Sequence, residues 1–468
     1  MAMLAVGSAP SMHGFAGHRG LPQWLSTPLR LWSVISGMWT TALLSAVPVA
    51  PARALDLGPS GDRNDETIAY RDRLKDYDNI KRYGAERVAD RDRKQFQPDG
   101  IRAGDFIFLP SIGTTLIFDD NVLVTNQNRR SDMRAEITPE LRVISQLPRH
   151  AFDLSLGGRI VEYSEHDELD RVNAHIKAGA AFHFDHATTL SMSILSRLDH
   201  TDQLDPFSPA FARQLVPFHE NRASIGLTRD VGRLYGTVSA TYQSLDFQDA
   251  KTETGAHINQ DASDMQTARA EVRAGYRFSP GYELTAKLSG LRQLNHGTAT
   301  LDRDAYGYDA LAGLQGEANP LLRWRILGGY GLRDFDQSNL ASIRSMIAEA
   351  EVQWLPTQYL TFYATARRLI SSSTDIEATG IVETSLKLRL DYEVWHNVVL
   401  KFTGDIKEHD FVGADRRDRI LVGRVGVDWY MAKNWLLNIS YEHMVRDSNT
   451  PENDLTRNVV MVGAKLKF

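Results

Sequence analysis

Four sites along the chain place a histidine beside an acidic residue or in a polar segment, where it could act as a general base. They are His166-Asp167, Asp199-His200, His409-Asp410 and His443. The acidic triplet Asp119-Asp120-Asn121 offers oxygen atoms that suit a calcium ion or another cation. The sequence contains no H-E-x-x-H, G-x-S-x-G or Walker motif. Because histidines and isolated acidic triplets are common in solvated loops, we predict no enzyme, no metal site and no cofactor.

Arginines and glutamates at even spacing form a second candidate set. Arg269, Glu271, Arg273 and Arg277 fall within one segment of alternating polarity. Successive side chains of a strand point to opposite faces, so residues at even spacing share a face. The predicted members of this polar face are Arg142, Arg159, Arg269, Arg273, Arg277, Arg323, Arg325, Arg367, Arg389, Glu271, Glu349 and Glu351. Such guanidinium rows attract a carboxylate-bearing glycan, or else mixed-sign pairs merely brace the wall; both interpretations stay open.

The elements that position these residues are long strands of period two. In the segment 458–468, Val460, Val462, Ala464, Leu466 and Phe468 share one face, and Lys465 and Lys467 share the other. Runs of this kind predict eighteen strands, near 106–118, 133–146, 150–164, 170–184, 187–201, 217–230, 233–247, 265–279, 282–296, 305–318, 321–335, 343–355, 358–371, 379–393, 397–411, 417–431, 434–446 and 456–468. An even number of long strands is typical of a single-chain outer-membrane barrel. We therefore predict an all-β fold, a transmembrane antiparallel up-and-down β-barrel over residues 105–468.

The connections between these strands alternate in length, which supports the same fold. Tight turns such as Asp185-His186, Val231-Gly232 and Pro280-Gly281 alternate with longer polar loops such as 201–217 and 248–264. In outer-membrane barrels the short turns are periplasmic, so both ends of an eighteen-stranded chain are expected there. The five tryptophans near the short turns are expected to form an aromatic girdle; they are Trp324, Trp354, Trp395, Trp429 and Trp435.

The segments before the barrel have other compositions. Residues 1–54 contain no Asp, Glu or Lys, and they combine an arginine flank, an apolar run and Ala52-Arg53-Ala54. This pattern predicts a secretory signal peptide, with a transmembrane anchor as the alternative. Residues 55–104 form a charged periplasmic leader, in which Tyr70, Leu74 and Tyr77 would share one face of a short helix. The alternative for the leader is a charged linker without a partner.

Composition limits the remaining possibilities. The 468 residues carry a formal net charge of −6 and no cysteine, which excludes a disulfide scaffold, a cysteine nucleophile and a lipid anchor on cysteine. A mean hydropathy of −0.33 excludes a polytopic helical membrane protein. A soluble sandwich or propeller is disfavoured, since its strands are typically about half as long. Arg292 and Arg368 fall on the predicted lipid face, and their places toward the loop ends of their strands make them tolerable.

The start of the barrel resembles a known family. The elements that match are Gly100-Ile101-Arg102-Ala103-Gly104, then Phe118-Asp119-Asp120-Asn121-Val122, and Arg149-His150-Ala151 after the second strand. This stretch of about 60 residues is similar to the opening of the outer-membrane β-barrel porin family, type 2, found beside exopolysaccharide and capsule gene clusters. The resemblance assigns Gly100, Arg102, Gly104, Asp119, Asp120 and Asn121 to the family motif. It implies a barrel with a role in export of a surface polysaccharide.

The functional expectation is a passive channel that conducts such a polysaccharide across the outer membrane. The alternatives are a general diffusion porin for small hydrophilic solutes, a rim-located enzyme or a purely structural barrel. The expected partners are outer-membrane lipid and lipopolysaccharide, the polysaccharide, a periplasmic polysaccharide-export protein and the barrel-assembly machinery, whose signal the terminal Phe468 resembles; no nucleic acid is expected. No loop looks long enough to fold in as a constriction, so we expect a wide conduit, narrowed at most by the leader.

Overall fold

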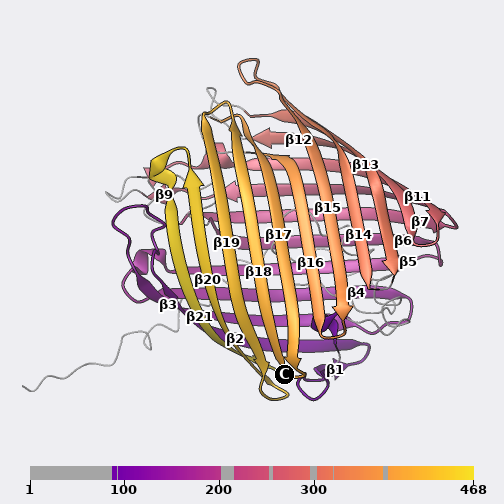
Figure 1. Cartoon of the computed structure of the whole chain (residues 1–468), viewed down its shortest axis with the longest axis horizontal. Coiled ribbons are helices and arrows are strands. Elements are labelled where there is room, and N and C mark those ends of the chain that lie inside the picture. The colour runs from indigo at the N-terminus through magenta and orange to yellow at the C-terminus, as the bar shows by residue number, and fades with distance from the viewer. Residues whose placement is uncertain are drawn as a thin grey trace, which may run out of the picture. The chain divides into compact units, whose positions relative to one another are not determined.

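A computed structural model describes residues 87–91, 93–201, 215–251, 257–295, 303–319, 321–372 and 378–468. One antiparallel sheet of nineteen strands closes on itself as a barrel (Figure 1). Within the described residues, no helix is long and apolar enough to cross a membrane. The predicted signal peptide, 1–54, and the predicted leader helix around Tyr70 lie outside the described residues.

Eighteen of the strands form the barrel wall, and each begins and ends within two residues of its predicted bounds. They are β2 (Phe106–Asp119), β3 (Asp132–Ser145), β4 (His150–Tyr163), β5 (Arg171–His183), β6 (Thr188–His200), β7 (Pro217–Val231), β8 (Leu234–Phe247), β11 (Met265–Ser279), β12 (Tyr282–Asn295), β13 (Ala305–Asn319), β14 (Leu322–Phe335), β15 (Ile343–Thr357), β16 (Leu360–Ser371), β17 (Gly380–Trp395), β18 (Val398–Val412), β19 (Arg416–Tyr430), β20 (Trp435–Ser448) and β21 (Leu455–Lys467). The predicted all-β transmembrane barrel is confirmed.

The other elements are short. Strand β1 (Ile101–Ala103) pairs with the start of β2, and β9 (Ala250–Lys251) pairs with β10 (His257–Ile258). Single 3-10 turns are η2 (Val88–Asp90), η3 (Asp167–Leu169), η4 (Asp261–Ser263) and η5 (Pro451–Asn453).

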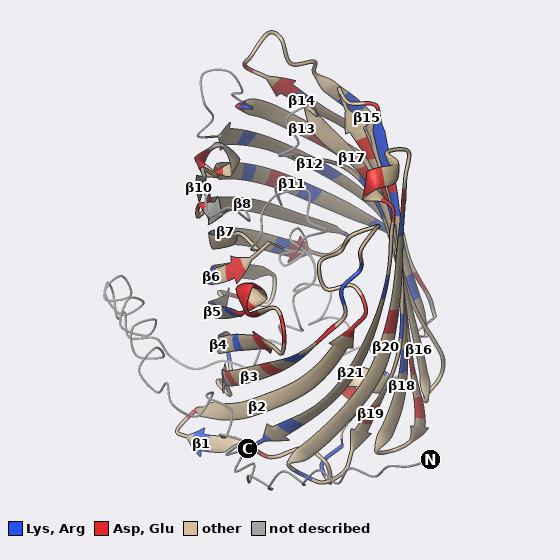
Figure 2. Ribbon diagram, turned by 90° about the vertical axis from the view of Figure 1, so that its left-hand side faces the viewer, with Lys and Arg blue, Asp and Glu red and all other residues tan. Residues whose placement is uncertain are grey.

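The two faces of the wall differ in chemistry, as the period of two predicts. On β11, Val272 and Tyr276 are exposed on the outside, whereas Arg273 between them retains only 6% of its accessible surface. Lys287 on β12 bonds Glu349 on β15, three strands away, at 2.7 Å. A contact across that distance is possible only over the concave inner side of the wall. Charged residues recur along the strands seen in Figure 2, and large apolar side chains such as Leu288 and Ile326 are exposed on the outside.

The end of the barrel with tight connections is called the short-turn rim, and the opposite end the long-loop rim. Gly232 and Gly281 adopt positive φ angles of 59° and 77° at the short-turn rim, where glycine avoids the strain that a side chain would bring. Trp354, Trp395 and Trp429 are exposed at the same rim, as an aromatic girdle requires.

Arg292 and Arg368, the two arginines predicted on the lipid face, lie toward the long-loop rim. Arg292 forms ion pairs with Asp336 at 2.7 Å and Asp304 at 3.3 Å. Arg368 donates to the hydroxyl of Thr384 at 2.6 Å. Near the interface a charge costs about 0–1 kcal/mol, against roughly 2–4 kcal/mol at the bilayer midplane.

The barrel closes where β21 pairs with β2, from Ser111–Lys467 to Asp119–Val459. We call this junction the seam. Asp119 is fully buried there and bonds both Arg457 and Arg134, the latter at 3.0 Å. Next to it, the Asp120 carboxylate accepts bonds of 2.6 Å from both the backbone and the side chain of Asn458. The family-motif acids therefore lock the last strand to the first.

The glycines of the family motif, Gly100 and Gly104, lie beside the short-turn end of β2. Gly100 and Gly104 have φ angles of 74° and 59°, and β1 lies between them against β2. Arg102 pairs with Ile107 in this hairpin. Because β21 pairs with β2 only from Ser111 onward, β1 covers the edge of β2 that β21 leaves open, which is one way to protect an exposed edge.

Candidate functional site

The lumen wall carries all twelve charged residues predicted for the polar face. They lie on β3, β4, β11, β14, β15, β16 and β17. In the centre of the wall, Lys287 lies 2.7 Å from Glu349 and 3.6 Å from Glu271. Beside them, Glu351 lies 2.8 Å from Arg325 and 3.8 Å from Arg367. These four contacts join charged residues of β11, β12, β14, β15 and β16 across the inner face of the wall, and we call these residues the charged network.

The other predicted arginines also face carboxylates. Their partners are Asp153 for Arg142, Glu136 for Arg159, Asp309 for Arg269, Asp230 for Arg277, Glu317 for Arg323 and Asp391 for Arg389. The contacts range from 2.7 Å for Arg142 and Arg277 to 3.9 Å for the largely exposed Arg159. Cross-strand pairing of this extent favours the interpretation that most of these charges brace the wall.

Arg273 differs from the other arginines of the set because it forms no ion pair with a described residue. Its guanidinium is buried, yet Nε and Nη2 have no hydrogen-bond partner among the described residues. A buried donor without a partner is costly, so these two nitrogens destabilise the wall locally.

A neutral patch lies next to the charged network. Its hydroxyls fall in register as Ser193–Ser224–Thr241, Ser191–Gly226–Ser239 and Thr189–Thr228–Thr237 on β6, β7 and β8. We call these eight Ser and Thr residues the hydroxyl panel. Ser193 and Ser224 are hydrogen-bonded at 2.6 Å, and Thr228 and Thr237 at 3.0 Å. Each hydroxyl is both donor and acceptor, so the panel offers many weak, exchangeable bonds to a polar solute.

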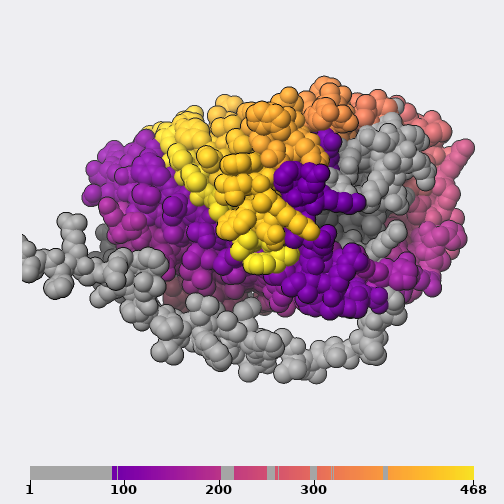
Figure 3. Space-filling view, turned by 90° about the horizontal axis from the view of Figure 1, so that it is seen from below, coloured from indigo at the N-terminus to yellow at the C-terminus, as the bar shows by residue number. Residues whose placement is uncertain are grey.

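The end of the predicted leader packs on the short-turn rim, and we call its described residues, 87–91 and 93–99, the leader segment. Arg93 is fully buried and donates to Glu393 at 2.7 Å and to the backbone oxygen of His396 at 3.1 Å. The backbone N–H of Val88 donates to the Thr361 hydroxyl at 2.9 Å. In Figure 3, which views the barrel from below, indigo residues lie against the yellow C-terminal strands. Sequence reasoning missed these contacts because a charged linker gives no periodic signal.

An exposed ion pair adds to this docking. Lys433 donates to Asp99 at 2.7 Å, and this hydrogen bond, with the lysine charge, holds the pKa of the Asp99 carboxyl below its ordinary value. Surface pairs of this kind contribute little to stability, so the buried Arg93 is the principal anchor of the leader segment.

Near the long-loop rim the wall itself folds into the lumen. Pairing between β15 and β16 stops at Ala348–Arg368, while β16 and β17 remain paired up to Ser371–Ile381. Beyond that break, Ile370 packs with Ile343 and Val382 in a buried cluster. A Cβ placed on the inward-facing Gly331 would lie 3.2 Å from Ile370 Cδ1. The ends of β16 and β17 therefore cover the inner face of β14 and β15.

Two polar contacts hold these strand ends, which we call the inward hairpin (369–372 and 378–382). The Ser372 hydroxyl donates to Gln293 Oε1 at 2.7 Å, and Arg303 donates to the backbone oxygen of Ala378 at 3.0 Å. The sequence predicts that no loop is long enough to fold in as a constriction, and what lies over the inner face here is a pair of strand ends. The loop is short, as the sequence indicates, but the strands that bear it bend inward.

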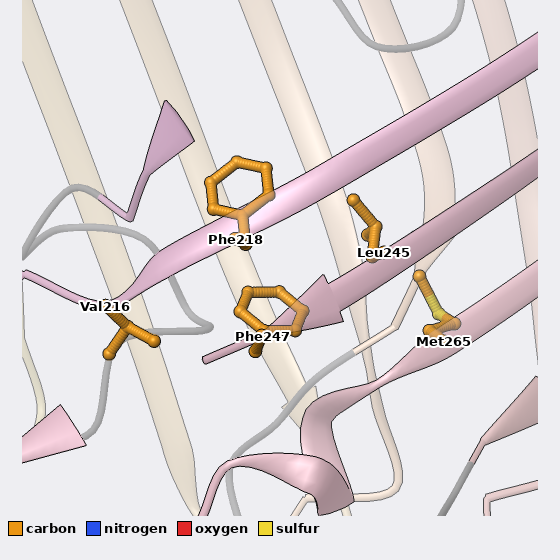
Figure 4. Close-up of a cluster of buried hydrophobic side chains, with 5 residues drawn as sticks. All are labelled: Val216, Phe218, Leu245, Phe247 and Met265. Carbon is orange, nitrogen blue, oxygen red and sulfur yellow. The ribbon is translucent and has the colours of Figure 1, made fainter. Parts of the chain in front are cut away.

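A buried apolar cluster supports the wall beside the inward hairpin. It consists of Val216, Phe218, Leu245, Phe247 and Met265, at the long-loop ends of β7, β8 and β11 (Figure 4). Arg197 lies 5.4 Å from the centre of the Phe218 ring, and pairs of this kind combine cation–π attraction with packing.

The histidines near the long-loop rim have structural partners. His166 lies 2.9 Å from Asp132, His200 lies 2.8 Å from Asn173, and His443 lies 2.8 Å from Asn458. No described serine hydroxyl bonds any of these three rings. Among the described residues, no group of three or more His, Asp or Glu side chains is arranged to hold a metal ion.

Comparison with known proteins identifies the class. Residues 94–468 match the family described as Putative beta-barrel porin 2, so the chain belongs to that family and is an outer-membrane β-barrel channel. A comparison with curated protein sequences gave no match.

Solved structures include similar barrels. OccK1 (OpdK) of Pseudomonas aeruginosa is 11% identical, with a TM-score of 0.41, over 77% of this chain and 99% of that one. OpdO of the same organism is 15% identical, with a TM-score of 0.43, over 78% and 98%. OccAB3 of Acinetobacter baumannii is 11% identical, with a TM-score of 0.41, over 78% and 100%. Similarity at this level says nothing of a substrate.

Proposed function

We propose that this barrel is a passive conduit through which a surface polysaccharide crosses the outer membrane. The observation that carries the proposal is the hydroxyl panel beside the paired charges of the lumen. Glycans present dense hydroxyl groups, and a wall of hydroxyls and satisfied ion pairs exchanges hydrogen bonds with them without holding them tightly. A barrel of 16–18 strands leaves an aqueous channel, so the driving force is supplied elsewhere and the protein performs no reaction.

The proposal includes an orientation and partners. The short-turn rim faces the periplasm, as in related barrels, which puts both chain ends and the leader segment on that side. A periplasmic polysaccharide-export protein would meet the barrel at this rim. Lipopolysaccharide and lipid surround the apolar outer face, and the barrel-assembly machinery inserts it.

Gene deletion followed by separate measurement of surface and periplasmic glycan tests this function. We expect the glycan to accumulate in the periplasm and its surface amount to fall, with restoration by the wild-type gene. Normal surface glycan in the deletion strain would refute the proposal.

A diffusion porin for small hydrophilic solutes is the second candidate. Extensive ion pairing in the lumen favours it, because paired charges discriminate weakly between solutes. The inward hairpin also narrows the lumen. Slower uptake of small hydrophilic solutes in the deletion strain, with unchanged surface glycan, would establish this alternative.

A further inference from the structure

A cavity of about 200 Å³ lies between the barrel wall and the inward hairpin. Its wall side comes from β7, β8 and β11 to β15, and its cover includes Leu369, Ile370, Ser371 and Ser372. Four arginines line it, Arg222, Arg269, Arg303 and Arg333, and no described lining residue is acidic. We propose that this cavity binds a single sugar ring that bears a carboxylate, the uronate type of residue.

The charge around the cavity favours an anion. Asp309 accepts bonds from Arg333 at 2.8 Å and from Arg269 at 3.2 Å. Glu220 lies 2.7 Å from Arg222 and 2.6 Å from Arg197. The two carboxylates are thus each shared between two guanidinium groups, Arg333 and Arg269 for Asp309 and Arg222 and Arg197 for Glu220, so these described groups together keep a net positive charge.

Unused donors point to the place of the carboxylate. Arg269 donates to described residues only through Nη1, to Ser289 and Asp309. Arg222 donates to described residues only through Nη2, to Glu220. The remaining N–H groups of these two arginines have no described acceptor, and guanidinium groups bind carboxylates through such paired donors.

The rest of the lining matches a sugar ring better than a bare ion. Gln243 and Thr241 offer an amide and a hydroxyl group for ring hydroxyls, and Leu291 and Ile343 offer apolar surface for the C–H face. Pockets for drug-sized ligands are about 300–1,000 Å³, so a cavity of about 200 Å³ suits one ring and not a length of chain. The choice of a sugar rests on the proposed function, whereas the preference for a carboxylate does not.

Single-channel recording with the purified full chain tests the site, with D-glucuronate, D-glucose, acetate and benzoate as probes. We expect brief current blocks with glucuronate and none with glucose or acetate. The double variant Arg222→Gln/Arg269→Gln should need at least tenfold more glucuronate for the same block. The control Arg424→Gln removes a lumen arginine that pairs with Glu442 on the far strands, and it should behave as the wild type.

Several outcomes would overturn the inference: no block by glucuronate, equal block by glucose, or full block in the double variant. Block by benzoate equal to that by glucuronate would refute the sugar assignment. Heat-modified mobility on gels confirms that each variant is folded. Gene deletion with glycan measurement tests the proposed function, and channel block by glucuronate tests the cavity. Either result can be negative while the other is positive, so the two proposals can fail separately.

Discussion

The seam between β2 and β21 and the break between β15 and β16 differ in how far their strand pairing extends toward the long-loop rim. The seam joins strands from the two ends of the barrel sequence, and its pairing continues to the long-loop rim, where Asp119 binds Arg457. Strands β15 and β16 follow each other through a tight turn, yet they part at Ala348–Arg368. Two strands that follow each other in the sequence therefore need not stay paired along their whole length, and two strands from opposite ends of the sequence can.

Side chains at the long-loop rim account for the difference. At the seam a buried carboxylate satisfies two guanidinium groups, and each backbone stays in the wall. Beyond the break, Ile370 and Val382, which have the parity of lipid-facing residues, pack inside the barrel against Ile343 on the inner face of β15. This packing gives both side chains many close van der Waals contacts, which individually are small and collectively large, in place of the missing pairing between β15 and β16.

The largest expected effect comes from breaking the seam with Asp119→Ala. Arg457 and Arg134 would lose their buried carboxylate, and removal of one partner of a buried pair costs about 3–5 kcal/mol. Urea unfolding followed by tryptophan fluorescence measures the loss. Glu442→Gln is the control, because its partner Arg424 is about half exposed and such pairs contribute at most about 1 kcal/mol. A seam variant no less stable than the control would contradict the assigned role.

A smaller effect is expected from Ile370→Ala, which weakens the inward hairpin. Ile→Ala changes in a core cost about 2–5 kcal/mol, and we expect the lower part of this range because the hairpin can open while the barrel stays folded. Single-channel conductance should rise, and amide exchange in 369–372 should quicken. Ile326→Ala, at a position 56% exposed on the outer face, should change neither. Unchanged conductance in both variants would mean that the hairpin does not narrow the channel.

The smallest effect is expected from Ser372→Ala. It removes the 2.7 Å bond to Gln293, and a single hydrogen bond contributes about 1 kcal/mol. Amide exchange of the hairpin should be slightly faster, with the global unfolding midpoint unchanged. Ser193→Ala in the hydroxyl panel is the matched control and should leave the hairpin as it is. If both serine variants exchange alike at 369–372, the contact with Gln293 does not hold the hairpin.

The same comparison explains what the sequence could predict. Alternation of period two located all eighteen strands and the inward parity of Arg273 or Glu349, because lipid and water impose opposite chemistry on the two faces. It could not locate the break, since Ile370 and Val382 have the parity and the apolar character of lipid-facing residues. Arg303 lies in a polar loop and Arg93 in a charged leader, where no period shows that an arginine becomes buried.

The locked seam also has a consequence for the order of assembly. Its bonds join residues 338 positions apart in the chain, so they can form only after every intervening strand has been delivered. Contacts of such long range are slow to form, and until then the edge of β2 beyond β1 is open to other chains. The Asp119–Arg457 pair can therefore form only in a complete barrel. A chain that stops before β21 keeps an unpaired edge on β2, and pairing with β21 closes that edge.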